Sequence, residues 1–498
     1  MAAHDPAAVR ALAERLIAIS SVSPDPTGEA RCAKAVLEAL PAGIESGTWP
    51  TRDGRPVVWV RVRGRSRRTL ILLGHFDTVG YHEYASLGAP AHDLIALDPA
   101  ALRERIVSEG AGSDSGTRIE RDIAEEWRRP GTWMFGRGAL DMKSGLAAGL
   151  AALERLASES GALGGDVMMI AAPDEEHLSA GMNTALESLP RDLELHGVLN
   201  LDYVDAPVAY RGAMGKSRFG VWVLGRPGHA GAPFEAVDAM QIAADLALRA
   251  TLSPALADRL EDRFGPPPVA LRLRDLKWGY DVQTAGQAEL ELNVVGFGRP
   301  RDETLGRLRV LALTSVREVL RRRDALRGEI APGAPAPESR EPMVLRYDEL
   351  EKQVTWGIED VMAAALRPPA QSAFFDQDWV AKIRDTARRA KLAGPAVVIE
   401  EVPPSYPAVA PADGPLSRAT ARVLGAEGLE VRTYYPFITD ASLVATRAWG
   451  AVERAPDIVT LGPWGRDAHG LFERVNALYA FERLPRLIAD VVRAALRS

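Results

Sequence analysis

The chain has 498 residues, more than one ordinary hydrophobic core accommodates, so its length predicts two or more domains. Hydrophobic residues make up 47% and charged residues 26%, as in globular proteins, and the formal net charge of −7 argues against a nucleic-acid partner. No apolar run is long enough to span a bilayer and no basic segment precedes an apolar one at the start, so we expect a soluble, cytoplasmic protein without a membrane partner.

The single cysteine, Cys32, excludes an intramolecular disulfide and a thiolate-rich metal site. It falls on the apolar face of the second of two predicted N-terminal helices, residues 7–18 and 28–40. We therefore expect a buried structural thiol rather than a nucleophile.

The first candidate site residues follow two predicted strands, residues 56–62 and 69–73. The second strand runs into Gly-His-Phe-Asp, which contains His75 and Asp77. Because side chains alternate along a strand, these two residues point to the same side. A charged insertion, residues 81–131, comes next.

The stretch Gly-Arg-Gly-Ala-Leu-Asp-Met-Lys-Ser-Gly, residues 136–145, centres on Asp141. It precedes an apolar helix predicted over residues 146–156. An aspartate between glycines at such a turn lies where the backbone can approach a small charged ligand closely.

Two further predicted strands also end in acidic residues. Residues 166–172 are followed by Pro-Asp-Glu-Glu-His, which contains Glu175 and Glu176, and residues 197–201 are followed by Asp202. With a helix near residues 178–188, the alternation of strands and helices predicts an α/β fold with a mostly parallel sheet. Ligands of such sheets gather at the carboxyl ends of the strands.

The pattern changes after residue 206. We predict a strand at 217–224, a helix at 236–252, a pair of strands within 281–297 that is broken near residue 285, a helix at 304–322 and a strand at 394–400. This β-α-β-β-α-β order predicts an α+β domain, residues 207–409, inserted into a catalytic domain formed by residues 1–206 and 410–498. Residues 325–390 form an extra segment within the insert.

These residues can hold two metal ions. Two adjacent ions need one shared anionic bridge and further imidazole and carboxylate ligands on rigid strand ends or turns. The candidates are His75, Asp141, Glu176, Asp202 and His469. Nitrogen and oxygen donors without thiolate suit two Zn²⁺, and Mn²⁺ or Co²⁺ are alternatives.

Neighbouring residues suggest supporting roles. Glu175 is adjacent to a ligand and is placed to act as a general base toward a water molecule. Asp77 is a natural partner for the second ring nitrogen of His75. His177 adjoins Glu176 and competes with the assigned residues for a ligand role.

The order of these motifs strongly resembles the aminoacylase and carboxypeptidase G family of co-catalytic zinc hydrolases, which includes the ArgE and DapE deacylases. The motifs are His-x-Asp, Gly-x-Gly-x-x-Asp-x-Lys-x-Gly, Asp-Glu-Glu, a later Asp, and Gly-Pro-x-Gly-x-x-Ala-His, and they cover residues 75–473. Residues 74–84, 275–284 and 403–407 resemble the arginine-utilisation protein RocB branch, which implies a role in amino-acid catabolism.

The resemblance assigns ligands to each ion. It implies that His75, Asp141 and Asp202 hold one zinc, and that Asp141, Glu176 and His469 hold the other. Glu175 would be the base.

The resemblance also implies roles outside the metal ligands. The inserted domain corresponds to the family's lid or dimerisation domain, which implies a homodimer formed through the lid. In its Gly-Arg-Pro-Gly-His turn, His229 would polarise a substrate carbonyl, usually in the neighbouring subunit. Asn293 and Asp440 match substrate-side positions.

Taken together, these features predict a di-zinc amidohydrolase or peptidase acting on a small-molecule amide or peptide substrate. A non-catalytic metal-binding or regulatory protein with the same fold is the first alternative. A mononuclear site with a structural zinc is the second, and metal stoichiometry distinguishes it.

Overall fold

The computed structural model describes residues 5–87, 93–110, 117–333, 341–354, 378–447 and 456–497. The chain divides into two compact units, Met1–Met214 with Pro407–Ser498, and Gly215–Tyr406. The predicted extra segment at 325–390 falls partly on residues 334–340 and 355–377, which lie outside the described residues, as do residues 88–92 and 111–116 of the predicted insertion at 81–131.

An eight-stranded sheet forms the centre of the first unit, in the order β1-β2-β5-β3-β6-β16-β7-β15. Its strands are β1 (Glu45–Pro50), β2 (Pro56–Val62), β3 (Arg68–His75), β5 (Asp166–Ala172), β6 (Glu194–Asn200), β7 (Ala209–Ala213), β15 (Val431–Tyr435) and β16 (Ile458–Thr460). The four central strands β5, β3, β6 and β16 run parallel to one another, as do β7 and β15. The pairs β1–β2, β2–β5 and β16–β7 are antiparallel. This mixed, centrally parallel sheet confirms the predicted fold class.

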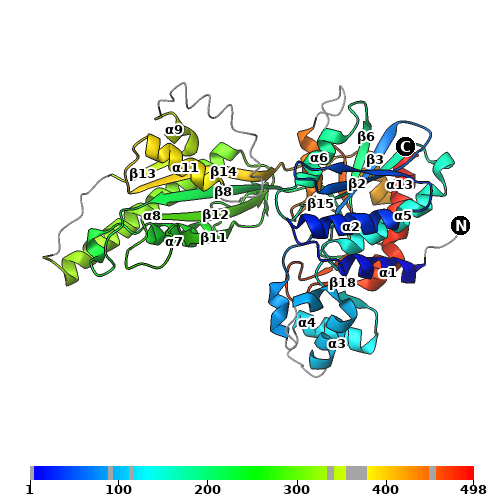
Figure 1. The fold of residues 1–498 in the computed structure, drawn as a ribbon. Coiled ribbons are helices and arrows are strands. Elements are labelled where there is room, and N and C mark those ends of the chain that lie inside the picture. The colour runs from blue at the N-terminus through cyan, green and yellow to red at the C-terminus, as the bar shows by residue number, and fades with distance from the viewer. Residues whose placement is uncertain are drawn as a thin grey trace. The chain divides into compact units, whose positions relative to one another are not determined.

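Helices pack against this sheet and against one another (Figure 1). They are α1 (Pro6–Ile17), α2 (Pro26–Glu38), α5 (Lys143–Ala157), α6 (Ala180–Ser188), α12 (Pro415–Ala426) and α13 (Leu484–Leu496). The first two begin at a proline that follows an aspartate cap, a sequence that favours helix initiation. Cys32 lies fully buried in α2, which confirms the expected structural thiol.

A smaller three-stranded sheet in the same unit joins distant parts of the chain. Its order is β17 (Gly465–Arg466), β18 (Arg474–Asn476) and β4 (Trp133–Phe135). The predicted insertion supplies α3 (Pro99–Gly110) and α4 (Arg118–Arg128), which lie near β18 (Figure 1). The hairpin between β17 and β18 carries His469.

The second unit has a five-stranded sheet in the order β11-β12-β8-β14-β13. The strands are β8 (Gly215–Leu224), β11 (Val269–Asp275), β12 (Gln287–Gly296), β13 (Met343–Arg346) and β14 (Ala396–Tyr406), with a short pair β9 (Arg259–Leu260) and β10 (Arg263–Phe264). The helices are α7 (Ala239–Ala250), α8 (Arg301–Ile330), α9 (Tyr347–Glu351) and α11 (Asp378–Arg389). Within the described ranges, no helix of either unit is long and apolar enough to cross a membrane.

One predicted strand pair is wrong in detail. Residues 287–296 form a single strand, which lies between β11 and β8 and is antiparallel to both, and residues 281–286 form no second strand. The turn signal near residue 285 marks the end of a long loop after β11, not a tight hairpin turn. With the short pair β9–β10 and the elements β13, α9 and α11 set aside, the order β8-α7-β11-β12-α8-β14 matches the predicted β-α-β-β-α-β arrangement.

Candidate metal centre

Three of the five candidate ligands lie at the carboxyl ends of adjacent parallel strands. His75 closes β3, Glu176 follows β5 and Asp202 follows β6. Since β5, β3 and β6 are neighbours in the sheet, their ends bring these side chains to one edge. Asp141 comes from the turn before α5, and His469 comes from the β17–β18 hairpin.

Asp141 lies between the two histidines. Its Oδ1 is 3.1 Å from Nε2 of His75, and its Oδ2 is 3.1 Å from Nε2 of His469. Glu176 Oε1 lies 3.0 Å from the same nitrogen of His469. Each oxygen of Asp141 therefore belongs to a different half of the centre.

The ligand atoms form two groups that share Asp141. In one group the atoms of His75, Asp141 and Asp202 lie within 4.8 Å of one another, and in the other those of Asp141, Glu176 and His469 do. These groups have the membership that the resemblance implies for the two ions. Imidazole nitrogens and carboxylate oxygens without thiolate match the donor preference of zinc and related divalent ions.

Burial disfavours ionisation of the acidic groups at this centre. His75, Asp141 and Asp202 are 3%, 6% and 3% exposed. Burial raises the pKa of Asp202 well above its usual value, and the charge of Asp141 raises it further. Burial likewise raises the pKa of Glu176, again with a contribution from Asp141.

The histidines respond in the opposite sense. Burial disfavours the charged form of His469, but Glu176 and Asp141 outweigh it and raise the pKa of His469 to about 12. Burial also opposes ionisation of Asp141, yet hydrogen bonds from His469 and His75 hold the pKa of Asp141 below its usual range. A centre that favours positive charge so strongly fits divalent cations.

Asp77 holds the residues that follow β5. Its Oδ1 accepts a hydrogen bond from the backbone nitrogen of Glu175 at 3.1 Å, and its Oδ2 accepts one from that of Glu176 at 3.0 Å. The same Oδ1 lies 3.4 Å from Nδ1 of His75, whose closer neighbour is the backbone oxygen of Asp77 at 3.2 Å. Asp77 thus links a candidate ligand on β3 to the acidic pair after β5.

Glu175 faces the centre without belonging to either ligand group. Its Oε2 lies 4.0 Å from Nε2 of His75, and its buried Oε1 has no hydrogen-bond partner within the described residues. Burial raises the pKa of Glu175 well above its usual value. A carboxylate of this kind can exchange a proton with a bound water molecule.

Asp440 is buried nearby. It begins a short 3₁₀ helix, Asp440–Thr446, and its charge acts on Glu175. Burial raises the pKa of Asp440 to about 7. His177, the competing candidate, has Nδ1 3.5 Å from Oδ1 of Asp174, and it is in neither ligand group found among the described residues.

His229 and Asn293 belong to the second unit. His229 is exposed in the loop after β8, and its Nδ1 accepts a hydrogen bond from the backbone nitrogen of Gly231 at 3.0 Å. Asn293 lies on β12, where its buried Oδ1 has no hydrogen-bond partner among the residues described. Their roles toward substrate stay predictions.

Glu473 is a supporting residue that the sequence reasoning missed. Its Oε1 accepts hydrogen bonds from the backbone nitrogens of Leu140 and Asp141, and its Oε2 accepts one from Arg137 at 2.5 Å. Arg137 also donates to the backbone oxygen of His469 at 3.1 Å. In the sequence, the only indication that Glu473 supports the site is its position four residues after His469. Nothing in the sequence connects Glu473 with Asp141.

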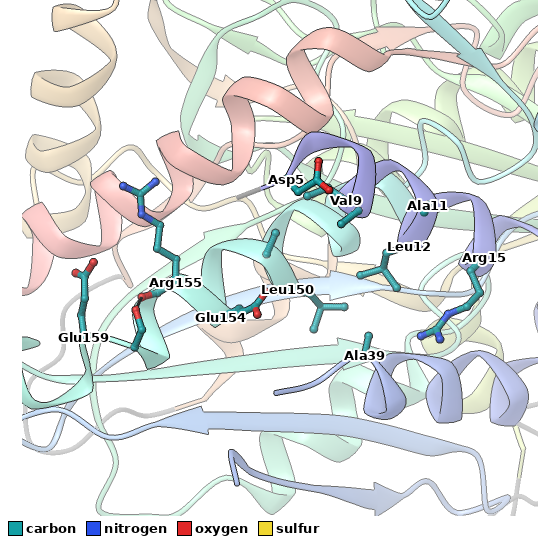
Figure 2. Close-up of a pocket in the computed structure, with 13 residues that line it drawn as sticks. Asp5, Val9, Ala11, Leu12, Arg15, Ala39, Leu150, Glu154, Arg155 and Glu159 are labelled. Carbon is teal, nitrogen blue, oxygen red and sulfur yellow. Dashed lines mark hydrogen bonds between the residues drawn. The ribbon is translucent and has the colours of Figure 1, made fainter. Parts of the chain in front are cut away.

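A separate pocket of about 850 Å³ lies elsewhere in the first unit (Figure 2). It is lined by residues of α1 and α5, with Ala39 at the end of α2, and includes Leu12, Arg15, Glu154 and Arg155. The candidate ligands are not among its lining residues, so this pocket is distinct from the metal centre.

Comparison with known proteins identifies the family. The sequence model of peptidase family M20/M25/M40 matches residues 120–494. The chain belongs to this family. It is therefore related to metal-dependent hydrolases of the peptidase type, and the predicted family resemblance is confirmed.

Two relatives come from Bacillus subtilis (strain 168). The chain is 29% identical to the uncharacterized protein YqjN over 495 residues, covering 90% of this chain and 88% of the relative. It is 25% identical to protein RocB over 567 residues, covering 98% and 95%. The similarity to RocB confirms the predicted relationship to that branch.

Solved structures share the fold. A tripeptidase from Staphylococcus aureus has a TM-score of 0.57 at 15% identity, with 99% of both chains covered. The Bacillus subtilis YXEP protein, described as a dinuclear metal binding peptidase, has a TM-score of 0.54 at 12% identity, with 99% of this chain and 98% of that chain covered.

Proposed function

We propose that this chain is a di-zinc amidohydrolase that cleaves an amide or peptide bond of an N-acyl amino acid or a small peptide. The observation that carries the proposal is the position of Asp141, which directs one carboxylate oxygen toward each of two histidines. A carboxylate shared in this way suits a pair of ions and has no evident use at a single structural ion.

Each residue of the centre has a part in the proposed reaction. His75, Asp141 and Asp202 would hold one divalent cation, and Asp141, Glu176 and His469 the other. When bound, the cations would supply Lewis acidity toward a substrate carbonyl and would lower the pKa of a water molecule. Glu175 accepts a proton from the attacking water and delivers it to the departing nitrogen. Asp77 keeps Glu175 in place through the backbone hydrogen bond.

Substrate contacts are proposed for three residues outside the ligand groups. His229 would donate a hydrogen bond to the developing oxyanion, as its turn motif suggests. Asn293 and Asp440 would contact polar groups of the substrate. The relationship to protein RocB supports arginine derivatives as the first substrates to try, in amino-acid catabolism.

We also propose a homodimer formed through the second unit. Strand β11 lies at the edge of the five-stranded sheet, where backbone groups are open to another strand. Its residues Val269 and Leu271 are 46% and 53% exposed, and Leu248 of α7 is 82% exposed. Light scattering on the Leu248→Glu variant tests this proposal, since a dimer formed on this surface should dissociate.

Metal analysis and a substrate screen test the proposed activity. Protein purified without chelator should contain two divalent ions per chain and should hydrolyse at least one N-acyl amino acid or dipeptide, with arginine derivatives included in the screen. Glu175→Gln should keep both ions and lose turnover by about 10²–10⁴-fold. Two ions without hydrolysis would favour the non-catalytic alternative, and a single ion would favour the mononuclear one.

A further inference from the structure

The two halves of the metal centre are supported differently. His75 and Asp202 are fixed by buried strands of the large sheet. His469 instead lies on the β17–β18 hairpin, where its side chain is 47% exposed and its backbone has a left-handed φ of 64°. A ligand on such a loop needs other contacts to hold it in position.

Several such contacts come from the segment between β3 and β4, residues 81–131, in its described parts 81–87, 93–110 and 117–131. Asp122 on α4 is 4% exposed, and its carboxylate binds two arginines that flank the loop. Arg466 Nη1 lies 2.5 Å and 2.6 Å from the two oxygens of Asp122. Arg474 donates to Oδ2 of Asp122 through Nε at 2.8 Å and Nη2 at 2.6 Å.

Other side chains of the segment reach the loop directly. The hydroxyl of Tyr84 donates to the backbone oxygen of Gly470, the residue after His469, at 3.2 Å. Glu83 forms an ion pair with Arg137, which itself donates to the backbone oxygen of His469. The segment therefore makes polar contacts on both sides of the loop that carries the ligand.

Apolar packing joins the same two parts of the chain. Leu471, Phe472 and Trp464 pack against a buried cluster that includes Leu102, Ile106 and Ile123 of α3 and α4. Trp133 and Trp464 meet edge to face with ring centroids 5.2 Å apart. Figure 1 shows α3 and α4 next to β18, the strand that follows the loop.

We propose that the 81–131 segment positions His469, so that this segment sets the affinity of one of the two metal ions. Asp122 and Tyr84 are positioning residues that act through the loop backbone. The ion held by Asp141, Glu176 and His469 depends on them, whereas the ion held by His75, Asp141 and Asp202 does not. This inference rests on the proposed two-ion centre.

Titration of the full-length, chelator-treated protein with Co²⁺ tests the proposal, with visible absorption and calorimetry as readouts. In Asp122→Asn, we expect one ion to bind about 10–100-fold more weakly and the other to keep its wild-type affinity. Tyr84→Phe keeps the aromatic ring in the cluster and removes only the hydrogen bond to Gly470, so a smaller weakening of the same ion is expected.

Asp166→Asn is the matched control. Asp166 is also 4% exposed and binds an arginine, Arg61, but lies at the opposite end of β5 from Glu176. It should lower thermal stability while leaving both cobalt affinities unchanged. Equal weakening of both ions in Asp122→Asn, or wild-type affinity for both, would overturn the proposal.

Hydrogen exchange in the metal-free protein supplies a second readout. Asp122→Asn should speed exchange of the amides at 467–473 and leave those next to His75 and Asp202 unchanged. Unchanged exchange at 467–473 would contradict the proposal even if the two-ion centre is correct. Fewer than two cobalt ions in the wild-type protein would instead overturn the proposed function.

Discussion

Glu473 accepts a hydrogen bond from the backbone nitrogen of Asp141 at 3.2 Å, through the same oxygen that accepts one from Leu140. The acceptor is fully buried and its other oxygen binds Arg137, which is 1% exposed. The turn that presents Asp141 is therefore fixed by a residue 332 positions away in the sequence.

Two substitutions of Glu473 distinguish the contribution of its hydrogen bonds to the Asp141 turn from that of its ion pair with Arg137. Glu473→Leu removes the acceptor for both backbone nitrogens and leaves Arg137 buried without this partner, so we expect a loss of about 3–5 kcal/mol in the free energy of unfolding. Glu473→Gln keeps an acceptor for the turn and should lose less. Chemical denaturation of both variants measures the difference, and equal losses would show that the turn contact contributes nothing.

Removing the shared carboxylate should affect both ions. Asp141→Ala deletes an oxygen directed at each histidine, so we expect less than one equivalent of metal per chain after gel filtration. Asp202→Ala is the control, since Asp202 belongs to one ligand group only and its variant should retain about one ion. Full occupancy of both ions in Asp141→Ala would disprove the bridging role.

Asp77 should influence turnover more than metal content. Asp77→Asn keeps one acceptor, the amide carbonyl oxygen, but its NH₂ group then faces the backbone nitrogen of either Glu175 or Glu176, which is also a donor. Because Glu175 is then held less well, we expect kcat to fall by about 10-fold or more, the typical effect of replacing a residue that supports a metal centre. Steady-state kinetics and metal analysis on the same sample test this, and unchanged kcat would refute it.

Glu29 should make stability fall with rising pH. It shares Arg55 with Asp174, and burial followed by the charge of Asp77 raises the pKa of Glu29 from 4.5 to about 8. In the unfolded chain Glu29 loses its proton near pH 4.5, whereas in the folded chain it keeps the proton until about pH 8. Between these values each pH unit lowers the stability contributed by this group, at most by about 1.4 kcal/mol.

Glu29→Gln replaces the protonated carboxyl with a neutral amide and should remove this dependence. Melting temperatures of the wild-type protein and the variant should therefore diverge from pH 5 to pH 8, with the variant increasingly the more stable. Parallel curves over this range would show that Glu29 is ionised in the folded protein.

The sequence indicated most of the candidate metal ligands because they follow local signals. His75, Glu176 and Asp202 come directly after apolar strands, and parallel strands bring such ends together. Asp141 lies in a glycine-rich turn, where Gly138 has a left-handed φ of 78°. Only the three-dimensional structure shows that His75, Asp141 and Asp202 are buried and that Asp141 lies between the two histidines.

The supporting residues could not be predicted in the same way. Asp122 and Arg474 are over 300 residues apart, and a charged residue on an amphipathic helix reads as solvent-exposed unless its partner is known. Strand β11 was not predicted, because a loop of residues 276–286 separates it from β12 and no tight-turn signal joins the two strands. Long-range pairing leaves little trace in a single sequence.

The chain passes from the first unit to the second after Met214 and returns after Tyr406. Within each unit, the residues at these two passages are neighbours. In the first unit Ala213 and Val409 exchange backbone hydrogen bonds at 2.9 Å, and in the second Lys216 pairs with Tyr406. If the chain were divided at these two points, the new ends of each unit would therefore be adjacent. Residues 215–406 therefore begin and end at neighbouring positions of one sheet. We expect that this domain can be replaced as a unit by the matching domain of a relative, and that a short linker can join the two ends left in the first unit.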